Sequence, residues 1–197
     1  MRKIGSILCF SGLSVLMLAV FLFSPWMVAG HASAHVATVR RQAVGRDTTT
    51  AKNIAQWGWG KVIVVSLSHQ EMEVFNNGHE VYDTLVTTGR PKLPTPTGSY
   101  RVFFKQSPIV FRSPFPRKSP NWYAPTHVKY ALEWKAGGYF IHDAWWHTTY
   151  GPGSNLWHYD PVYGWQWGSH GCIAVPLNAM IWLYHWATVG TTVRVIR

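Results

Sequence analysis

The hydrophobic pattern divides the 197-residue chain into an apolar N-terminal segment, a polar connection and a longer mixed region. Residues 4–28 are apolar apart from a few Ser and Gly, follow Arg2-Lys3, and precede the small residues Ala32-Ser33-Ala34. A positive start, an apolar run and a small-x-small site are typical of a secretory signal. We predict that residues 1–34 are a signal peptide; an uncleaved membrane anchor is the alternative, because the run is long enough to cross a bilayer.

The next segment, residues 35–57, consists largely of Ala, Thr, Arg and Gln without clear periodicity, which predicts a disordered spacer. A folded domain is then predicted at 58–197. Behind a signal or anchor, this domain would be exported to the cell envelope, in the periplasm or at the outer face of the membrane, or secreted.

From Lys61 onward the pattern is typical of β-strands. Residues 61–67 are β-branched and apolar, as in a buried strand, and Asn76-Asn77-Gly78 joins two strand-like segments as a tight hairpin turn. A helix is predicted from Ala179 to about Thr188, capped by Asn178 and ended by Gly190. Its side chains are apolar nearly all round, which indicates a buried packing helix. Further strands are predicted at 99–105, 139–142 and 191–196.

Two segments without a regular pattern are predicted to be long loops. Residues 107–127 hold five prolines among aromatic and basic residues, and residues 151–167 are rich in Gly, Trp and Tyr. A long loop in a compact domain is usually functional, so we interpret 107–127 as a lid or binding wall, with a packed surface loop as the alternative. The sequence therefore predicts a mainly β fold with one packing helix near the C-terminus and long aromatic loops.

The net charge of the chain indicates which classes of partner it favours. Without residues 1–34 the chain keeps 16 basic and 8 acidic side chains, a net charge of +8. Outside the cytoplasm such a balance favours an anionic wall polymer or membrane surface over nucleic acid, while a merely solvated basic face is the plain alternative.

Cys172 is the strongest candidate for chemistry. It is the only cysteine after the N-terminal apolar run, so it has no disulfide partner in the domain. It is either a small buried hydrophobe or a nucleophile, and His170, Gly171 and the strand residue His142 favour the nucleophile. A base is needed because a free thiol, with a pKa of about 8.5, is largely protonated at neutral pH.

The histidine and cysteine spacing argues against a metal site. His142, His147 and His170 are the candidate ligands, but one cysteine and scattered histidines match no zinc spacing. We predict no metal and no cofactor, and interpret the other domain histidines as surface or partly buried side chains: His69, His79, His127 and His185.

Four motifs in order resemble the catalytic domain of the L,D-transpeptidases, or YkuD-like domains. They are Thr87-Thr88-Gly89, Pro94-Thr95-Pro96-Thr97-Gly98, Ile141-His142-Asp143-Ala144 and Ser169-His170-Gly171-Cys172-Ile173. The resemblance runs from about Lys61 to Arg197 and implies a β-sandwich of mixed sheets with a helix on one side. It also implies cross-linking of peptidoglycan stem peptides outside the cytoplasm, with these stem peptides as partners.

The resemblance also implies roles for particular residues. Cys172 would be the nucleophile, His142 its general base, and Asp143 would orient the His142 ring through its main-chain carbonyl. Gly171 and Cys172 would offer backbone N–H groups to the oxyanion, with Tyr123 as a further candidate donor. Four residues are assigned to shaping the pocket and binding substrate: Ser169, His170, Trp145 and Trp146.

The chain departs from the family pattern in two places. Ala174 stands where the family usually has Arg or Asn, which puts substrate affinity in question. The interval from His142 to Cys172 is longer, with residues 151–167 inserted, and we interpret the insertion as an enlarged rim. It leaves His147 and His158 as rival bases.

Three functions follow as hypotheses. The first is a peptidoglycan L,D-transpeptidase, in which the thiolate attacks a tetrapeptide stem, releases D-alanine and passes the acyl group to an amine. The second is an L,D-carboxypeptidase, with water as the acceptor. The third is a non-catalytic wall-binding module with the same fold.

Overall fold

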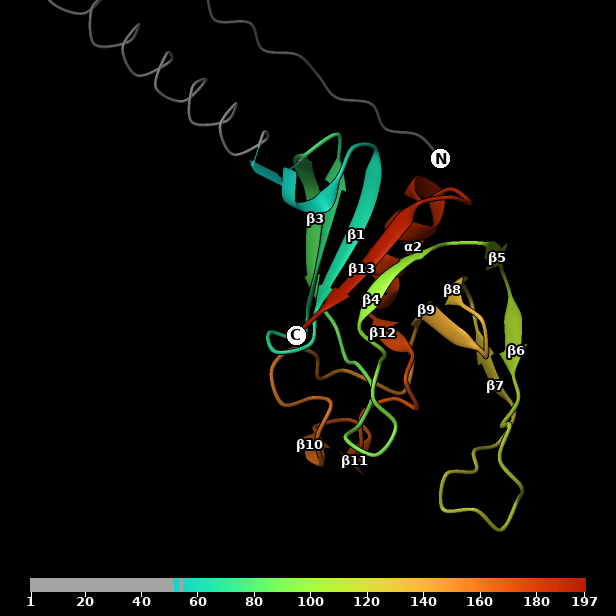
Figure 1. Cartoon of the computed structure of the whole chain (residues 1–197). Helices are drawn as coiled ribbons and strands as arrows, with labels where there is room; N and C mark the ends of the chain where they lie inside the picture. Colours follow the sequence, from blue (N-terminus) through green and yellow to red (C-terminus); the bar gives the residue numbers. More distant parts are fainter. Residues whose placement is uncertain (1–51, 54) are drawn as a thin grey trace, which may run out of the picture. The chain divides into compact units, whose positions relative to one another are not determined.

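The computed structural model describes residues 52, 53 and 55–197 (Figure 1). The predicted signal or anchor, residues 1–34, and most of the predicted spacer lie outside these residues. At the end of the spacer, residues 55–57 are helical. The Trp57 ring packs 6.5 Å from that of Phe75, and the Trp57 carbonyl accepts a 3.0 Å hydrogen bond from Arg194. Contacts with the domain therefore begin before residue 58.

The first sheet has five strands in the order β3, β2, β1, β13, β4. Central strand β1 pairs parallel with β13 and antiparallel with β2. The predicted hairpin between β2 and β3 is confirmed, with Asn77 and Gly78 at φ angles of 51° and 77°, as a tight primed turn requires. The bounds of these strands are β1 Lys61–Ser66, β2 Glu71–Asn76, β3 His79–Leu85, β4 Gly98–Arg101 and β13 Thr192–Ile196.

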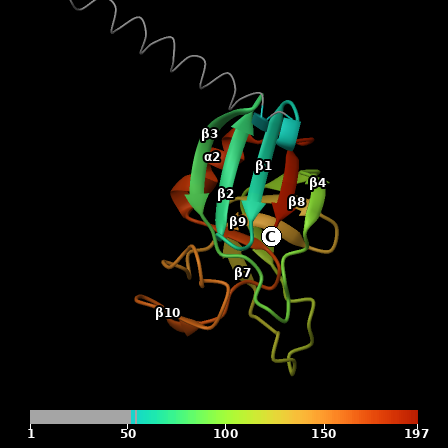
Figure 2. The ribbon, with the colours of Figure 1, turned by 60° about the vertical axis from the view of Figure 1, so that its left-hand side comes forward.

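The second sheet has four strands in the order β12, β9, β8, β5, and its β12–β9 pair is parallel. Helix α2, Leu177–Trp186, follows β12 directly. In Figure 2 the five-stranded sheet lies in front, with α2, β8 and β9 behind it. The bounds of these strands are β5 Phe104–Gln106, β8 Ala131–Lys135, β9 Tyr139–Asp143 and β12 Ile173–Val175.

The core lies between the first sheet and the layer formed by the second sheet and α2. Ile63 of β1, Ile141 of β9 and Leu183 of α2 are all fully buried in one cluster. The alternate β1 residues Val62 and Val64 are buried on the opposite face with Phe75. Because β1 is covered on both faces, its sequence is a continuous apolar run rather than an alternating one. The predicted mainly β fold of mixed sheets with a C-terminal helix is confirmed.

The two predicted loops each contain a two-stranded ribbon, which the sequence interpretation missed. Ribbon β6–β7 brackets the proline-rich segment, and ribbon β10–β11 lies inside the inserted segment. Their bounds are β6 Ile109–Phe111, β7 Thr126–Val128, β10 His158–Asp160 and β11 Gly164–Gln166.

Two other predictions need correction. The strand predicted at 99–105 is split between the two sheets: the Val102 N–H bonds the Thr191 carbonyl, whereas the Phe103 N–H bonds the Glu133 carbonyl. The helix begins at Leu177, so Asn178 lies inside it, and the preceding residue makes no side-chain cap. The helix also leaves Ile181 partly exposed, so it is buried on one face rather than all round. Among the described residues, no helix has the length and apolarity needed to cross a membrane.

Candidate active site

Cys172 lies directly before β12, beside the parallel strand β9. Its Sγ accepts a 3.5 Å hydrogen bond from the Phe140 N–H and lies 3.4 Å from the Gly138 carbonyl oxygen. Gly171 before it has a φ of 113°, and a Cβ there would lie 2.8 Å from Cε1 of Tyr139. This turn therefore needs glycine, both for its backbone angle and for the close approach of the tyrosine ring.

The turn that presents Cys172 is held by two hydroxyl groups. Ser169 Oγ donates to the Cys172 carbonyl at 2.6 Å and accepts from the Gly171 N–H at 3.0 Å. Thr95 Oγ1 donates to the Gly171 carbonyl at 3.0 Å and accepts from the Gly89 N–H at 2.8 Å. Thr95 belongs to the Pro-Thr-Pro-Thr-Gly motif, to which the sequence interpretation gave no role. That motif fixes the backbone around the thiol.

His142 lies on β9 with only 4% of its side chain exposed. Its Nδ1 is 2.8 Å from the Asp143 carbonyl oxygen. Because a carbonyl can only accept, Nδ1 carries the proton and Nε2 is left as the acceptor. The Asp143 carboxylate accepts the N–H groups of Lys129 and Tyr130 instead, so Asp143 contacts the His142 ring through its backbone.

The pKa shifts of His142 and Cys172 both favour the uncharged form of the side chain. Burial lowers the pKa of His142 below its ordinary value, although the Asp143 carbonyl acts in the opposite direction. Burial raises the pKa of the Cys172 thiol to about 11, while the Phe140 N–H lowers it by a smaller amount. At neutral pH these shifts favour the neutral thiol and the neutral imidazole.

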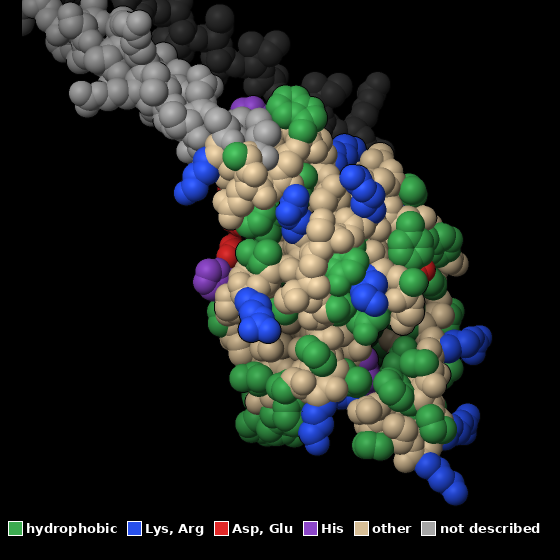
Figure 3. Space-filling view, in the orientation of Figure 1, with side chains coloured by type: hydrophobic (Ala, Val, Ile, Leu, Met, Phe, Trp, Pro, Cys, Tyr) green, Lys and Arg blue, Asp and Glu red, His purple; other side chains and the backbone are tan. Residues whose placement is uncertain are grey.

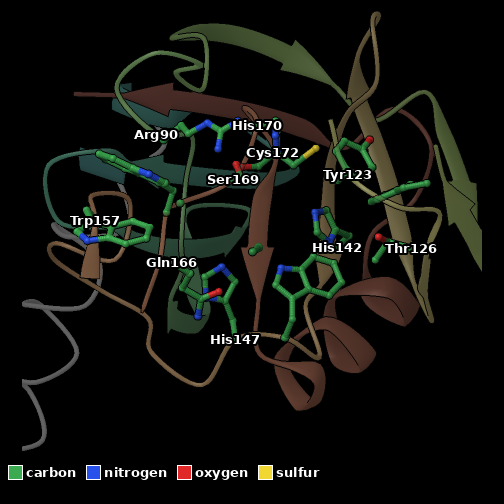
Figure 4. A pocket seen from close by; sticks show the side chains of 15 residues that line it. Arg90, Tyr123, Thr126, His142, His147, Trp157, Gln166, Ser169, His170 and Cys172 are labelled. Carbon is green, nitrogen blue, oxygen red and sulfur yellow. The ribbon is translucent and has the colours of Figure 1, made fainter. Parts of the chain in front are cut away.

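A cavity of about 380 Å³ opens beside Cys172 (Figure 4). Of the residues predicted for the site, six line it: Tyr123, His142, Trp146, Ser169, His170 and Cys172. Trp145 is not among the lining residues. It is 60% exposed, and its indole N–H donates to the His127 carbonyl at 3.1 Å. The structure thus separates the two neighbouring tryptophans, with Trp146 facing the cavity.

Two of the three predicted oxyanion donors, the Gly171 N–H and the Tyr123 hydroxyl, already have partners. The Gly171 N–H is bound by Ser169 Oγ, as described above, and the Tyr123 hydroxyl donates to the Arg112 carbonyl at 3.2 Å. Burial and the neighbouring Cys172 raise the pKa of Tyr123, so this phenol stays protonated and keeps its donor. Either group can serve an oxyanion only after its present hydrogen bond opens or is shared.

The proline-rich segment forms one wall of the cavity through Phe111, Tyr123 and Thr126. The Phe111 ring meets the edge of His142 at 4.9 Å, and the Tyr123 ring lies 5.1 Å from that of His170. Burial and the nearby Arg90 lower the pKa of His170 to about 4, so this histidine is neutral too. The segment therefore packs against the buried His142 and shields part of the half-buried His170 from water.

Of the two rival bases, His158 lies in the inserted segment, and His147 lies between β9 and that segment. His147 lines the cavity but is stacked on His158, with ring centroids 5.9 Å apart, and Figure 4 shows it beside Gln166. Burial lowers its pKa to about 4, and no hydrogen-bond partner holds its Nδ1. His147 therefore lacks the carbonyl that orients His142. Within the described part of the chain, no group of three or more His, Cys, Asp or Glu side chains could hold a metal ion.

Ala174, the departure from the family pattern, is buried in β12 opposite His142 and lines the cavity. Sequence reasoning assigned no site role to six further lining residues: Arg90, Phe111, Thr126, Trp157, Gln166 and Trp167. Three of them, Trp157, Gln166 and Trp167, come from the inserted segment, which therefore forms part of the cavity rim. Gly168, which lines the cavity, packs closely against the backbone of Asn155 in the insertion. A Cβ at this position would lie 2.6 Å from the Cα of Asn155, so the close contact requires glycine.

Comparison with known proteins supports the same class. The profile of the YkuD family, the L,D-transpeptidase catalytic domain, matches residues 60–195, and the chain belongs to this family. Mycobacterium tuberculosis L,D-transpeptidase 1 is 27% identical over 136 residues, which make up 68% of this chain and 49% of that protein. The chain thus spans about half the length of this curated relative.

Solved structures agree with the fold. An L,D-transpeptidase from Mycobacterium smegmatis gives a TM-score of 0.59 at 26% identity, covering 71% of this chain and 60% of that one. A structure of the transpeptidase LdtMt1 in complex with imipenem gives a TM-score of 0.60 at 26% identity, with the same coverage of 71% and 60%.

Proposed function

We propose that this chain is a peptidoglycan L,D-transpeptidase that uses Cys172 as its nucleophile. The observation that carries the proposal is the fixed tautomer of His142: the Asp143 carbonyl holds the Nδ1 proton and leaves Nε2 to accept from a thiol in the same cavity. Membership of the YkuD family supports the reaction class. A cavity of about 380 Å³ is within the range that suits a peptide-sized ligand.

The proposed reaction has two steps. Cys172 Sγ attacks the carbonyl after the third residue of a tetrapeptide stem while His142 takes the thiol proton. When the tetrahedral intermediate collapses, His142 returns that proton to the leaving amine, D-alanine departs, and a thioester remains. The amine of an acceptor stem then attacks the thioester, and the thiol is regenerated. With water as the acceptor, the same thioester would give the tripeptide product of an L,D-carboxypeptidase.

We also propose that the reaction takes place outside the cytoplasm, in the cell envelope. The support is the sequence of residues 1–34, with its positive start, apolar run and small-residue site.

The test is mass spectrometry of the protein and its products after incubation with a disaccharide-tetrapeptide. Imipenem is a second probe, because a related transpeptidase has been solved with it. Cys172→Ala is the control. We expect an acyl adduct on the wild-type protein and a cross-linked dimer product, both absent from the Cys172→Ala protein.

The other outcomes are distinct. Tripeptide without cross-linked dimer would identify a carboxypeptidase. A folded wild-type protein that forms neither adduct nor product would reject both enzymatic hypotheses and favour the wall-binding module.

A further inference from the structure

The inserted hairpin β10–β11 has exposed aromatic side chains on one face and the buried Asp160 on the other. Tyr159 and Trp165 stand directly opposite each other in the ribbon, at 59% and 61% exposure. Trp157 and Trp167 share their parity along the strands, so they belong to the same outward face, and both are about half exposed. We call these four residues the aromatic platform: Trp157, Tyr159, Trp165 and Trp167.

The rings of the platform adjoin one another. The Trp157 centroid lies 5.4 Å from that of Trp167 and 5.8 Å from that of Trp165, and Trp165 lies 5.7 Å from Tyr159. Figure 3 shows hydrophobic side chains gathered at the lower end of the domain, where β10 and β11 lie in Figure 1. A contiguous exposed aromatic surface of this kind marks a binding site more often than a chance feature.

The opposite face anchors the hairpin to the domain. Asp160 is fully buried, and its carboxylate accepts the backbone N–H groups of Thr148 and Thr149 from outside the hairpin, together with those of Val162 and Tyr163 from its turn. A two-stranded ribbon is only marginally stable alone. This hub of hydrogen bonds therefore holds the platform in a fixed position.

The platform is continuous with the candidate active site. Trp157 and Trp167 line the same cavity as Cys172. Trp167 also lines a neighbouring pocket of about 280 Å³, together with the cationic Arg90 and Lys92. A ligand held by Cys172 can thus extend directly onto the platform.

Charge distinguishes the platform from the pocket beside it. Residues 151–167 contain no Lys or Arg, and their one acid, Asp160, is buried. The platform is therefore neutral and presents flat rings with polar edges, whereas the adjoining pocket is cationic. A pyranose ring has an apolar face that stacks on such rings while its hydroxyl groups stay in water. A neutral sugar chain with an anionic peptide attached matches this arrangement.

We propose that the aromatic platform binds the neutral glycan strand that carries the stem peptide. This inference rests on the proposed function for its substrate. The donor bond follows the third stem residue, so three residues separate it from the sugar, a reach of about 10 Å in an extended chain. The glycan must then lie just outside the cavity, and the platform forms that edge of it.

The test is cosedimentation of the full chain, kept in a detergent without a sugar headgroup, with chitin, an insoluble neutral glycan of N-acetylglucosamine. Trp165→Ala and Tyr159→Ala remove platform rings that do not line the cavity, and Trp165→Phe keeps an aromatic ring. Trp59→Ala is the matched control, because Trp59 is 70% exposed and lies outside the hairpin. Thermal unfolding of each variant verifies that it is folded.

We expect Trp165→Ala to weaken glycan binding about tenfold, which corresponds to the loss of one well-buried aromatic contact in the complex. Tyr159→Ala should weaken it too, Trp165→Phe should retain most of it, and Trp59→Ala should leave it unchanged. Binding should be nearly the same at low and high salt, because no exposed charge of the hairpin contributes.

Three results would overturn the proposal: no binding of chitin by the wild-type protein, binding by both alanine variants as strong as that of wild type, or platform-dependent binding to phosphatidylcholine vesicles in place of glycan. The last would identify a membrane-facing surface; the N-terminal apolar segment is common to all variants, so only differences between them are interpreted. Glycan binding by a protein that forms no acyl adduct would reject the proposed function while retaining the platform. Cross-linking activity without glycan binding would reject the platform proposal while retaining the proposed function.

Discussion

Two strand pairs contribute to the cavity in opposite ways. The parallel pair β9–β12 lies inside the domain; His142 is a buried residue of β9, and Cys172 directly precedes β12. The antiparallel pair β10–β11 is joined to no other strand and exposes its aromatic face. Around the buried pair, the pKa values of His142 and Cys172 are shifted and the tautomer of His142 is fixed. The exposed pair instead presents a surface of aromatic rings to solvent. Under the two proposals made above, the reaction and the recognition of its substrate reside on separately built parts.

The sharpest test of this division removes His142 from the buried pair and, in a second variant, His147, which lies between β9 and β10 and stacks on His158. We expect His142→Ala to lower the rate of Cys172 acylation by about 10²- to 10⁴-fold, the usual contribution of a positioned general base. The matched variant His147→Ala also removes an imidazole from the cavity wall. It should change the rate less than tenfold, because no carbonyl orients its ring. The measurement is the rate of adduct formation by mass spectrometry.

A reversal of these two effects would mean that His147, outside the buried strand pair, supplies the base, and the division between the two strand pairs would not hold. Equal losses in both variants would point to a shared proton path through the cavity instead.

A smaller effect is expected where the hairpin joins the domain. Asp160→Asn leaves one oxygen for the backbone N–H groups that the carboxylate now accepts, and turns an amide N–H toward donors. We expect local destabilisation of the hairpin by about 1–3 kcal/mol. Hydrogen exchange at Thr149 and Val162 should accelerate accordingly. Asp83→Asn, at an exposed acid on β3, is the control and should leave this exchange unchanged.

The pKa of Asp160 also sets how the stability of the hairpin depends on pH. Burial acts to raise the pKa of Asp160, but the hydrogen bonds from Thr148, Val162 and Tyr163 outweigh it and hold the pKa below its ordinary range. Its contribution to stability is therefore complete above the unfolded pKa, about 3.9, and is lost as the pH falls below that value. Hairpin exchange that responds to acid equally in wild type and Asp160→Asn would contradict this role.

The sequence was most informative where local and global requirements coincide. The apolar run of β1 and the Asn-Gly turn predicted their elements correctly, because both depend on neighbouring residues alone. The motif around Cys172 predicted the family for the same reason. The strand at 99–105 was predicted as one because its break depends on Thr191 and Glu133, which are distant in the chain.

The candidate site shows the same limit. Thr95 and Arg90 reach it through folding of a loop about eighty residues before Cys172, and no local pattern marks that contact. The β10–β11 hairpin did leave a signal, since Trp157 to Asp160 and Gly164 to Trp167 alternate between aromatic and other residues. Its many turn-forming residues obscured the period of two.

The smallest expected effect is that of pH on the acylation rate above neutrality, where we expect almost no change. Because burial raises the pKa of the Cys172 thiol to about 11 and lowers that of His142, the thiol and imidazole persist together over a wide range. The acylation rate should rise as His142 loses its proton below about pH 6.5, and then stay nearly constant to about pH 9. Stopped-flow acylation by imipenem and thiolate absorbance at 240 nm measure the two quantities separately.

An ion-pair mechanism predicts a different pair of curves. Thiolate absorbance would then titrate near neutral pH in the wild-type protein and shift upward in His142→Ala. If that were observed, the buried β9–β12 pair would be stabilising separated charges rather than two neutral groups. The proton transfer would then precede substrate binding, and the low pKa of the thiol would have to come from donors that the resting site does not yet present to it.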